Sequence, residues 1–379
     1  DRFMVWPDQG PHGRFWCRGC GVAGDDVDYL VTVREMDKYE ALEACGRSRK
    51  DQGQKNGRTI SQKTTPERAK VLEELPDAWR DRARDLCNHA YKLMWSDQGK
   101  AARGYLNGRG LHDETIKAAA LGYVDKEVFE NPNAWGLSGE KKVWIPSPSI
   151  VIPKISDHKL YGVKFRRLEW DGVRVINMTE DPKYPSIRGS QPTLYGADQV
   201  TGHKIIFMTE GEFDALLLRQ EAGDLAGVVT LGSASVHRIP DRDLLTITGV
   251  DLALVAYDVD GAGLTGSVNL CAEYPALIRP ALMPGPGDLT DNHRRVDLRA
   301  WATERLIEHG ADMTTDELRR TYDVVLREHE GLIGYLDNQG IPHGERLNSV
   351  EKEKHQAICM RLSRLIKAIR DKETIHQGG

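Results

Sequence analysis

The sequence predicts an α/β fold with a parallel sheet, and the stretches that predict it lie between residues 204 and 263. "KIIFM" and "LALVAY" are continuous apolar runs, which are typical of strands buried on both faces. Between them, "EFDALLLRQEAG" has the apolar spacing of an amphipathic helix ending at Gly223, and "AGVVTLGSAS" repeats the strand and glycine turn. This alternation indicates a Rossmann-like parallel sheet.

Composition changes along the chain predict several domains. At 379 residues the chain is long enough for two or three, at roughly 150 residues each. An aromatic and Cys-containing module is followed by a polar, Lys- and Gly-rich linker, a mixed α and β region with many basic residues, the α/β region and a helical tail. The predicted segments are 1–45, 46–66, 67–200, 201–295 and 296–379, so the fold is α+β overall.

Composition also excludes several classes of protein. No run of about 18 apolar residues is present, so we expect no membrane span, and no secretory segment opens the chain. Six cysteines do not make a disulfide framework in a chain of this size, which indicates a cytoplasmic protein. Because the net charge is −5, a polyanionic partner requires local basic patches.

Cys17 and Cys20 are the closely spaced cysteines of the chain. They follow two short strand-like stretches, and glycines at 19 and 21 let a tight turn present both thiolates to one ion. The spacing favours a zinc half-site, with a pair of thiols that bind no metal as the alternative. His12 lies in the preceding loop, where we expect it to face solvent.

Carboxylates follow the two apolar strands at the point where each strand ends. Glu210 follows "KIIFM", and Asp258 and Asp260 follow "LALVAY". Because functional sites gather at the carboxyl ends of parallel strands, we expect these acids to converge there on Mg²⁺ or Mn²⁺. A turn stabilised by aspartate side chains is the alternative for Asp258 and Asp260. We expect Glu212 to lie in the solvated first turn of the following helix.

Several stretches resemble the DnaG-type primases of bacteria and phages. "FWCRGCG" resembles the second half of their zinc ribbon, and "YLNGRGL" resembles the opening of their polymerase core. "VKFRR" and "DPKYPSIRGSQPTLYG" resemble segments that contact template and nucleotide. "EGEFDAL", "LGSAS" and "DVDGAG" resemble the Toprim domain that these primases share with topoisomerases and some nucleases. These matches occur in the family's order over roughly residues 1–295.

The resemblance implies roles for individual residues. Glu210, Asp258 and Asp260 become the catalytic metal-binding acids, and Asp214 and Asp288 become auxiliary metal acids. Thr290 replaces the second aspartate of the family's pattern, and Asp291 lies one residue on. Cys17 and Cys20 become two of four Zn²⁺ ligands, with the others expected upstream of Asp1. The implied nucleotide and template contacts are Arg109, Arg166, Lys183, Tyr184 and Arg188; solvated basic residues are the alternative for each.

The resemblance further implies a DNA primase, a nucleotidyltransferase that makes RNA primers during DNA replication. The expected partners are a single-stranded DNA template, ribonucleoside triphosphates and a replicative helicase that contacts the C-terminal helices, although packing is the default role of those helices. No P-loop motif occurs in the chain. The alternatives are a Toprim nuclease, a topoisomerase, for which no cleavage-tyrosine domain is evident, and a non-catalytic DNA-binding protein.

Overall fold

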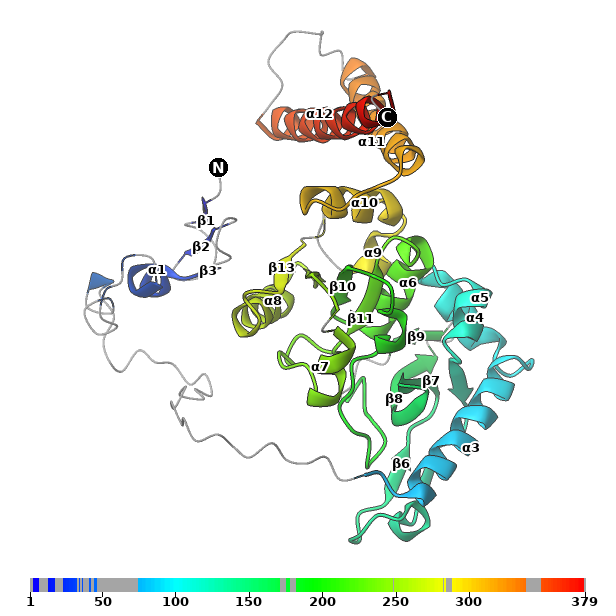
Figure 1. The fold of residues 1–379 in the computed structure, drawn as a ribbon. Helices are drawn as coiled ribbons and strands as arrows, with labels where there is room; N and C mark the ends of the chain where they lie inside the picture. The colour runs from blue at the N-terminus through cyan, green and yellow to red at the C-terminus, as the bar shows by residue number, and fades with distance from the viewer. Residues whose placement is uncertain are drawn as a thin grey trace. The chain divides into compact units, whose positions relative to one another are not determined.

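The computed structural model divides the chain into two compact units, Asp1–Glu74 and Leu75–Gly379, each described here by itself (Figure 1). The structure describes residues 3–6, 13–17, 23–32, 34, 36, 41, 44–45, 74–170, 175–177, 182–247, 249–281, 283, 288–338 and 349–377. The predicted linker, 46–66, lies outside these residues, as does Cys20.

The first unit contains a small antiparallel sheet and a helix. Its elements are β1 (Phe3–Trp6), β2 (Arg14–Cys17), β3 (Ala23–Gly24) and α1 (Asp26–Thr32). β2 lies between β1 and β3. Asp25 Oδ1 accepts the backbone N–H groups of Val27 and Asp28 at 3.0 and 3.1 Å, which satisfies free donors at the start of α1. Phe15 packs edge-on against Tyr29.

The second unit contains a parallel four-stranded sheet in the order β11-β10-β12-β13. Its strands are β10 (Ile205–Thr209), β11 (Gly227–Thr230), β12 (Leu252–Ala256) and β13 (Ile278–Pro280). The helices that follow them are α6 (Glu212–Ala222), α7 (Asp241–Ile247), α8 (Gly261–Glu273) and α9 (Leu289–Asn292). The predicted α/β class is therefore confirmed.

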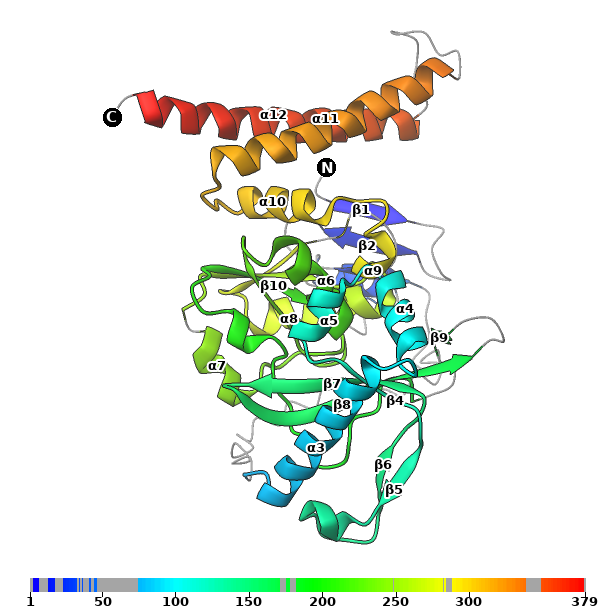
Figure 2. The same ribbon diagram turned by 90° about the vertical axis from the view of Figure 1, so that its right-hand side faces the viewer.

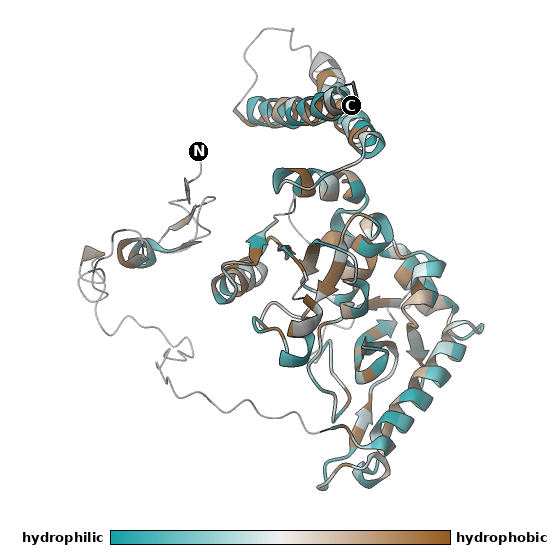
Figure 3. Ribbon diagram, in the orientation of Figure 1, coloured by the Kyte–Doolittle hydropathy of each residue, from teal (hydrophilic) through white to brown (hydrophobic). Residues whose placement is uncertain are grey.

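Helices cover both faces of this sheet, which explains why its central strands β10 and β12 consist almost entirely of apolar residues. Phe207 packs in one core cluster with residues of α6 and with Trp301, at a ring distance of 5.4 Å. Ile206 and Met208 pack in the other cluster, with Ile247 of α7 and Leu270 of α8. Successive side chains of a strand point to opposite faces, so both faces require apolar residues. Figure 3 shows these central strands largely in the brown of hydrophobic residues.

An antiparallel sheet precedes the parallel one in the chain, in the order β4-β7-β8-β9. Its strands are β4 (Gly122–Val124), β7 (Ser149–Ser156), β8 (Lys159–Trp170) and β9 (Val175–Asn177). The remaining elements of this region are α3 (Asp77–Met94), α4 (Lys100–Gly108), α5 (Asp113–Ala118), β5 (Val128–Glu130), β6 (Val143–Ile145), and the 3-10 helices η1 (Pro132–Trp135) and η2 (Ala197–Gln199). α3 packs along the sheet, where Trp79 joins Val151, Val163 and Phe165 in one core (Figure 2).

The second unit ends in three helices, α10 (Leu298–Glu308), α11 (Thr315–Asn338) and α12 (Ser349–Gln377). α11 and α12 lie side by side beyond α10 (Figures 1 and 2). Arg361 of α12 donates to Glu304 of α10 at 2.7 and 2.8 Å and to Glu328 of α11 at 2.6 Å. None of the described helices is long and apolar enough to cross a membrane.

Candidate active site

The carboxyl ends of β10 and β12 place two predicted acids next to each other. The strands are paired in parallel with Thr209 opposite Ala256. Glu210 directly follows β10, and Asp258 is the second residue after β12. The pairing therefore brings both carboxylates to one edge of the sheet, where open α/β proteins commonly bind ligands.

Asp260 also follows β12, but one of its oxygens has a structural partner. Asp260 is the N-cap of α8, and its Oδ1 accepts the backbone N–H groups of Ala262 and Gly263 at 2.9 and 2.7 Å. The alternative for Asp260, a local turn stabilised by the aspartate side chain, thus holds for this oxygen. A Cβ atom at Gly263 would lie 2.2 Å from the carbonyl oxygen of Asp258, so the start of α8 packs directly on the backbone of that aspartate.

The electrostatics of this edge disfavour charged carboxylates in the absence of a cation. Burial, followed by the charges of Asp260 and Asp288, raises the pKa of Glu210. Burial raises the pKa of Asp258 to about 7, with further contributions from Glu210 and Asp288. Burial and Asp288 also raise the pKa of Asp214, against an opposing effect of Arg109. Like charges brought together in this way stabilise the protonated forms.

Glu210 offers an open ligand position in this group of acids. Its Oε2 atom is buried and has no hydrogen-bond partner among the described residues. A buried polar atom usually has a partner, and an ion is one explanation for an exception. Carboxylate oxygens are the ligands that Mg²⁺ and Mn²⁺ prefer, so the chemistry of these residues fits a divalent cation.

Arg109 connects the end of α4 to Asp288, the N-cap of α9. Its Nη2 atom lies 3.0 Å from Asp288 Oδ2 and also donates to the hydroxyl of Thr290. The Thr290 hydroxyl donates to Asp288 Oδ1 at 2.8 Å, and the Thr290 N–H donates to Asp214 Oδ1 at 3.3 Å. Thr290 therefore joins two carboxylates. Asp291 is exposed, and its N–H donates to Asp288 Oδ1 at 2.6 Å.

Glu212 is buried, so the expectation that it is solvated was wrong. Its carboxylate accepts hydrogen bonds from Lys164 Nζ at 2.9 and 2.8 Å, and the same ammonium donates to the carbonyl oxygen of Gly232 at 2.8 Å. Lys164 thus joins β8, the first turn of α6 and the loop after β11. The helix dipole alone does not require solvent exposure, and here a buried cation stabilises the acid.

The predicted basic and aromatic contacts fall into two groups. Arg166 is buried with its guanidinium 4.3 Å from the Tyr184 ring centroid, while Lys183 and Tyr184 are exposed. The Lys164 ammonium lies 5.0 Å from the same ring. Arg188 instead donates to the carbonyl oxygens of Ser138, at 2.5 Å, and Lys141, so its guanidinium fastens a loop.

The predicted zinc residues are placed only in part. Cys17 is the last residue of β2, but its side chain lies outside the described part of the structure. Both the backbone and the side chain of Cys20 lie outside it.

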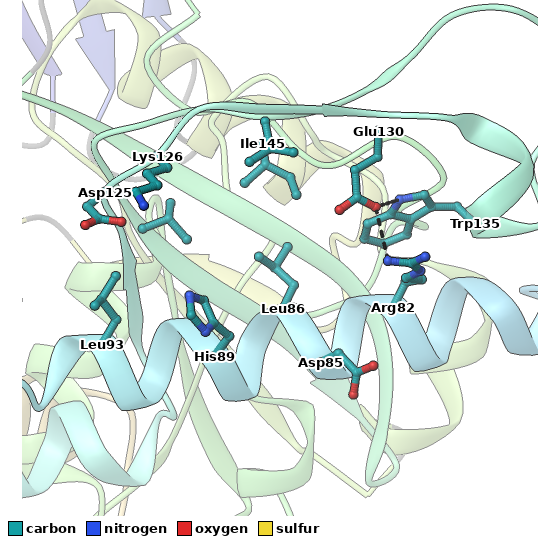
Figure 4. Close-up of a pocket in the computed structure, with 12 residues that line it drawn as sticks. Arg82, Asp85, Leu86, His89, Leu93, Asp125, Lys126, Glu130, Trp135 and Ile145 are labelled. Carbon is teal, nitrogen blue, oxygen red and sulfur yellow. Dashed lines mark hydrogen bonds and ion pairs between the residues drawn. The ribbon is translucent and has the colours of Figure 1, made fainter.

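A pocket of about 310 Å³ lies between α3 and the β5–β6 hairpin (Figure 4). Glu130 closes one end, where its Oε2 accepts the Trp135 indole N–H at 2.7 Å and lies 3.7 Å from Arg82 Nη1. None of the predicted site residues lines this pocket, so it is separate from the acidic cluster.

The fold and this site define an α/β protein in which carboxylates gather at one edge of a parallel sheet and cationic side chains extend from a neighbouring antiparallel sheet. No family model matches the chain. The sequence is nevertheless similar to bacterial DNA primases, which confirms the resemblance to DnaG-type primases.

The similarity covers most of this chain. The DNA primase of Myxococcus xanthus is 27% identical over 333 residues, which are 80% of this chain and 52% of the relative. The DNA primase of Helicobacter pylori strain J99 is 25% identical over 361 residues, 86% of this chain and 59% of the relative. The chain thus spans about half the length of these curated relatives.

Solved primase structures are more distant. The zinc-binding and RNA polymerase domains of the Aquifex aeolicus primase align at 19% identity and a TM-score of 0.46, over 92% of this chain and 83% of that one. The RNA polymerase domain of Mycobacterium tuberculosis DnaG aligns at 14% identity and a TM-score of 0.48, over 74% of this chain and 99% of that one.

Proposed function

We propose that the chain contains the polymerase core of a DnaG-type DNA primase, which makes RNA primers on single-stranded DNA in the cytoplasm. One observation carries this proposal: burial and neighbouring carboxylates raise the pKa of Glu210, Asp258 and Asp214 at the edge of the sheet, and a buried oxygen of Glu210 has no partner among the described residues. The similarity to bacterial DNA primases supports the choice of substrate class.

Glu210, Asp258 and Asp288 are the residues that would hold Mg²⁺ or Mn²⁺, with Asp260 and Asp214 next to them. Such a cation lowers the pKa of an attacking 3′-hydroxyl and neutralises charge on the triphosphate. Arg109 orients Asp288 through the hydrogen bond of 3.0 Å. Asp260 fixes the chain direction after Asp258 by capping α8. Catalysis then rests on positioning and charge stabilisation and requires no covalent nucleophile.

We assign Lys183, Tyr184 and Arg166 to template or nucleotide contacts. The exposed Lys183 supplies charge for a phosphate, and the Tyr184 ring, held by Arg166, offers a surface on which a base stacks. Arg188 contributes by holding its loop, since its guanidinium is used by main-chain oxygens. Cys17 and Cys20 are proposed as two ligands of a zinc ribbon, and α11 and α12 as the contact for a replicative helicase.

The test is incorporation of labelled ribonucleotides on single-stranded DNA with Mg²⁺. We expect template-dependent oligoribonucleotides from the wild type and none from Asp258→Asn. Asp251→Asn is the matched control, because Asp251 is exposed at the opposite end of the same strand, and it should retain full activity.

Two outcomes contradict the proposal. Cleavage of the DNA without polymerisation, abolished by Asp258→Asn, would show the Toprim nuclease. DNA binding without either activity, unchanged in Asp258→Asn, would show the non-catalytic alternative.

A further inference from the structure

The two C-terminal helices bring together three side chains that commonly bind metals. His329 lies on α11, and His355 and Cys359 lie on α12. Residues four apart occupy one face of a helix, so the spacing of His355 and Cys359 directs both toward α11. All three side chains are half-buried, and one ligand atom from each lies within 4.8 Å of the others.

The distances within this group are close to those of a tetrahedral zinc site. The Nε2 atoms of His329 and His355 are 3.2 Å apart. Two imidazoles on one tetrahedral Zn²⁺ have their nitrogens about 3.4 Å apart, from the usual Zn–N bond lengths. His355 Nε2 lies 3.8 Å from Cys359 Sγ, and a nitrogen and a thiolate on one Zn²⁺ are separated by about 3.5 Å. The third pair, the ligand atoms of His329 and Cys359, lies within 4.8 Å, so it requires the largest adjustment on metal binding.

The donor set favours zinc over the cation proposed at the acidic cluster. Imidazole and thiolate are ligands for Zn²⁺, whereas Mg²⁺ and Mn²⁺ prefer carboxylate and carbonyl oxygens. We propose that His329, His355 and Cys359 bind one Zn²⁺ ion that clips α12 to α11. On binding, the Cys359 thiol releases its proton to solvent and each neutral imidazole donates its Nε2 lone pair. The fourth position is left for water or an added ligand.

The bound Zn²⁺ would join His329 of α11 to His355 of α12, which are 26 positions apart in sequence. Beyond the imidazole pair, the helices are joined by the ion pairs Arg361–Glu328 and Arg319–Glu373 and by packing around Val325 and Leu365. Surface ion pairs of this kind contribute little individually. A metal bound only by the paired helices therefore stabilises their association. This proposal is independent of the proposed polymerase activity.

The test is a titration of the metal-free full chain with Co²⁺, which takes the same geometry and reports its ligands by absorption. Cys17→Ser and Cys20→Ser are introduced first, so that the predicted zinc ribbon contributes no thiolate. We expect a thiolate-to-cobalt charge-transfer band whose intensity corresponds to one thiolate-bound Co²⁺ per chain, and Zn²⁺ should displace this ion. Carboxylate sites give no such band. Absence of the band from the titration overturns the proposal. The titrated chain keeps His329, His355 and Cys359 unchanged, so a failure of a ligand variant to fold does not affect this result.

Variants in the same background then assign the ligands. Cys359→Ser should abolish the band, and His329→Gln should weaken Co²⁺ binding by about tenfold or more. The matched controls are Cys271→Ser, which changes another half-buried thiol, and His309→Gln, which changes a histidine at the end of α10. Far-ultraviolet circular dichroism verifies folding. A band that persists in Cys359→Ser means that another cysteine binds the Co²⁺, and it overturns the proposal.

Discussion

Lys164 and Glu212 form a buried ion pair in which the ammonium lies 2.9 and 2.8 Å from the two carboxylate oxygens. The Lys164 side chain is 10% exposed and that of Glu212 is 1% exposed. The pair connects the basic strand β8 to the helix that follows Glu210, so it sets the position of the antiparallel sheet relative to the acidic edge.

Replacing one partner of this pair should strongly destabilise the second unit. Lys164→Met leaves a buried carboxylate without its cation, and we expect a loss of about 3–5 kcal/mol in the free energy of unfolding, measured with urea. The double variant Lys164→Met, Glu212→Leu should recover most of this loss. Lys204→Met, which removes an exposed partner 4.0 Å from Asp251, is the control and should cost less than about 1 kcal/mol. Equal losses in the free energy of unfolding for Lys164→Met and Lys204→Met would show that burial does not determine the contribution of the ion pair.

Removing the Thr290 hydroxyl should loosen the connection between Arg109 and Asp288. Thr290→Val keeps the size of the side chain but removes hydrogen bonds to charged groups, each contributing about 1.5–3 kcal/mol. We expect reduced stability and weaker Mg²⁺ binding, measured by thermal unfolding with and without the ion. Thr265→Val is the control, because Thr265 is exposed and its hydroxyl donates to the carbonyl oxygen of Gly261 in its own helix, α8. Unchanged Mg²⁺ binding in Thr290→Val would show that the Thr290 hydroxyl does not contribute to the proposed metal site.

The metal-free protein should lose stability as the pH rises from about 4 to about 7. Asp258 has a pKa of about 7 in the folded protein against an ordinary value of 3.8. The folded state therefore binds more protons than the unfolded state across this range, and each increase in pH favours unfolding. The melting temperature measured without metal should decrease as the pH rises through this range. The decrease should be smaller in Asp258→Asn. Added Mg²⁺ should restore stability above pH ~7 in the wild type but not in Asp258→Asn. The same dependence of melting temperature on pH in both proteins would contradict this prediction.

Adding one methyl group at Gly263 should displace Asp258. The new Cβ would lie 2.2 Å from the Asp258 carbonyl oxygen, so the strand end or α8 must shift. Small displacements of reacting groups cost about 100-fold in rate, and we expect ribonucleotide incorporation to fall to that extent in Gly263→Ala. Gly261→Ala is the matched control, since its Cβ meets no atom within 4 Å, and it should remain active. Comparable activities would show that the Asp258 backbone tolerates movement.

The sequence predicts the acidic edge well because its signal is local. Glu210 and Asp258 each follow an apolar strand, and parallel pairing alone brings them together. The buried state of Glu212 was not predictable in this way, because its partner Lys164 lies 48 positions away on another sheet. The same reason applies to Arg188, whose carbonyl acceptors lie 47 and 50 positions earlier, and to His329, whose neighbours lie on the next helix. Polar side chains inside otherwise apolar elements, such as Lys164 next to Val163 and Phe165, are the signal that points to such partners.

The ion pairs of α10 form a mechanical path from the C-terminus to the acidic edge. Arg361 joins α12 to Glu304 of α10, and Arg299 of α10 donates to Asp224, the second residue after α6, at 2.6 and 2.8 Å. The opposite end of α6 carries Glu212 and Asp214. A force applied to α12 would therefore be transmitted through the contacts of Arg361 and Arg299 to α6, the helix that supports the candidate active site. This route does not pass through the connection between α11 and α12.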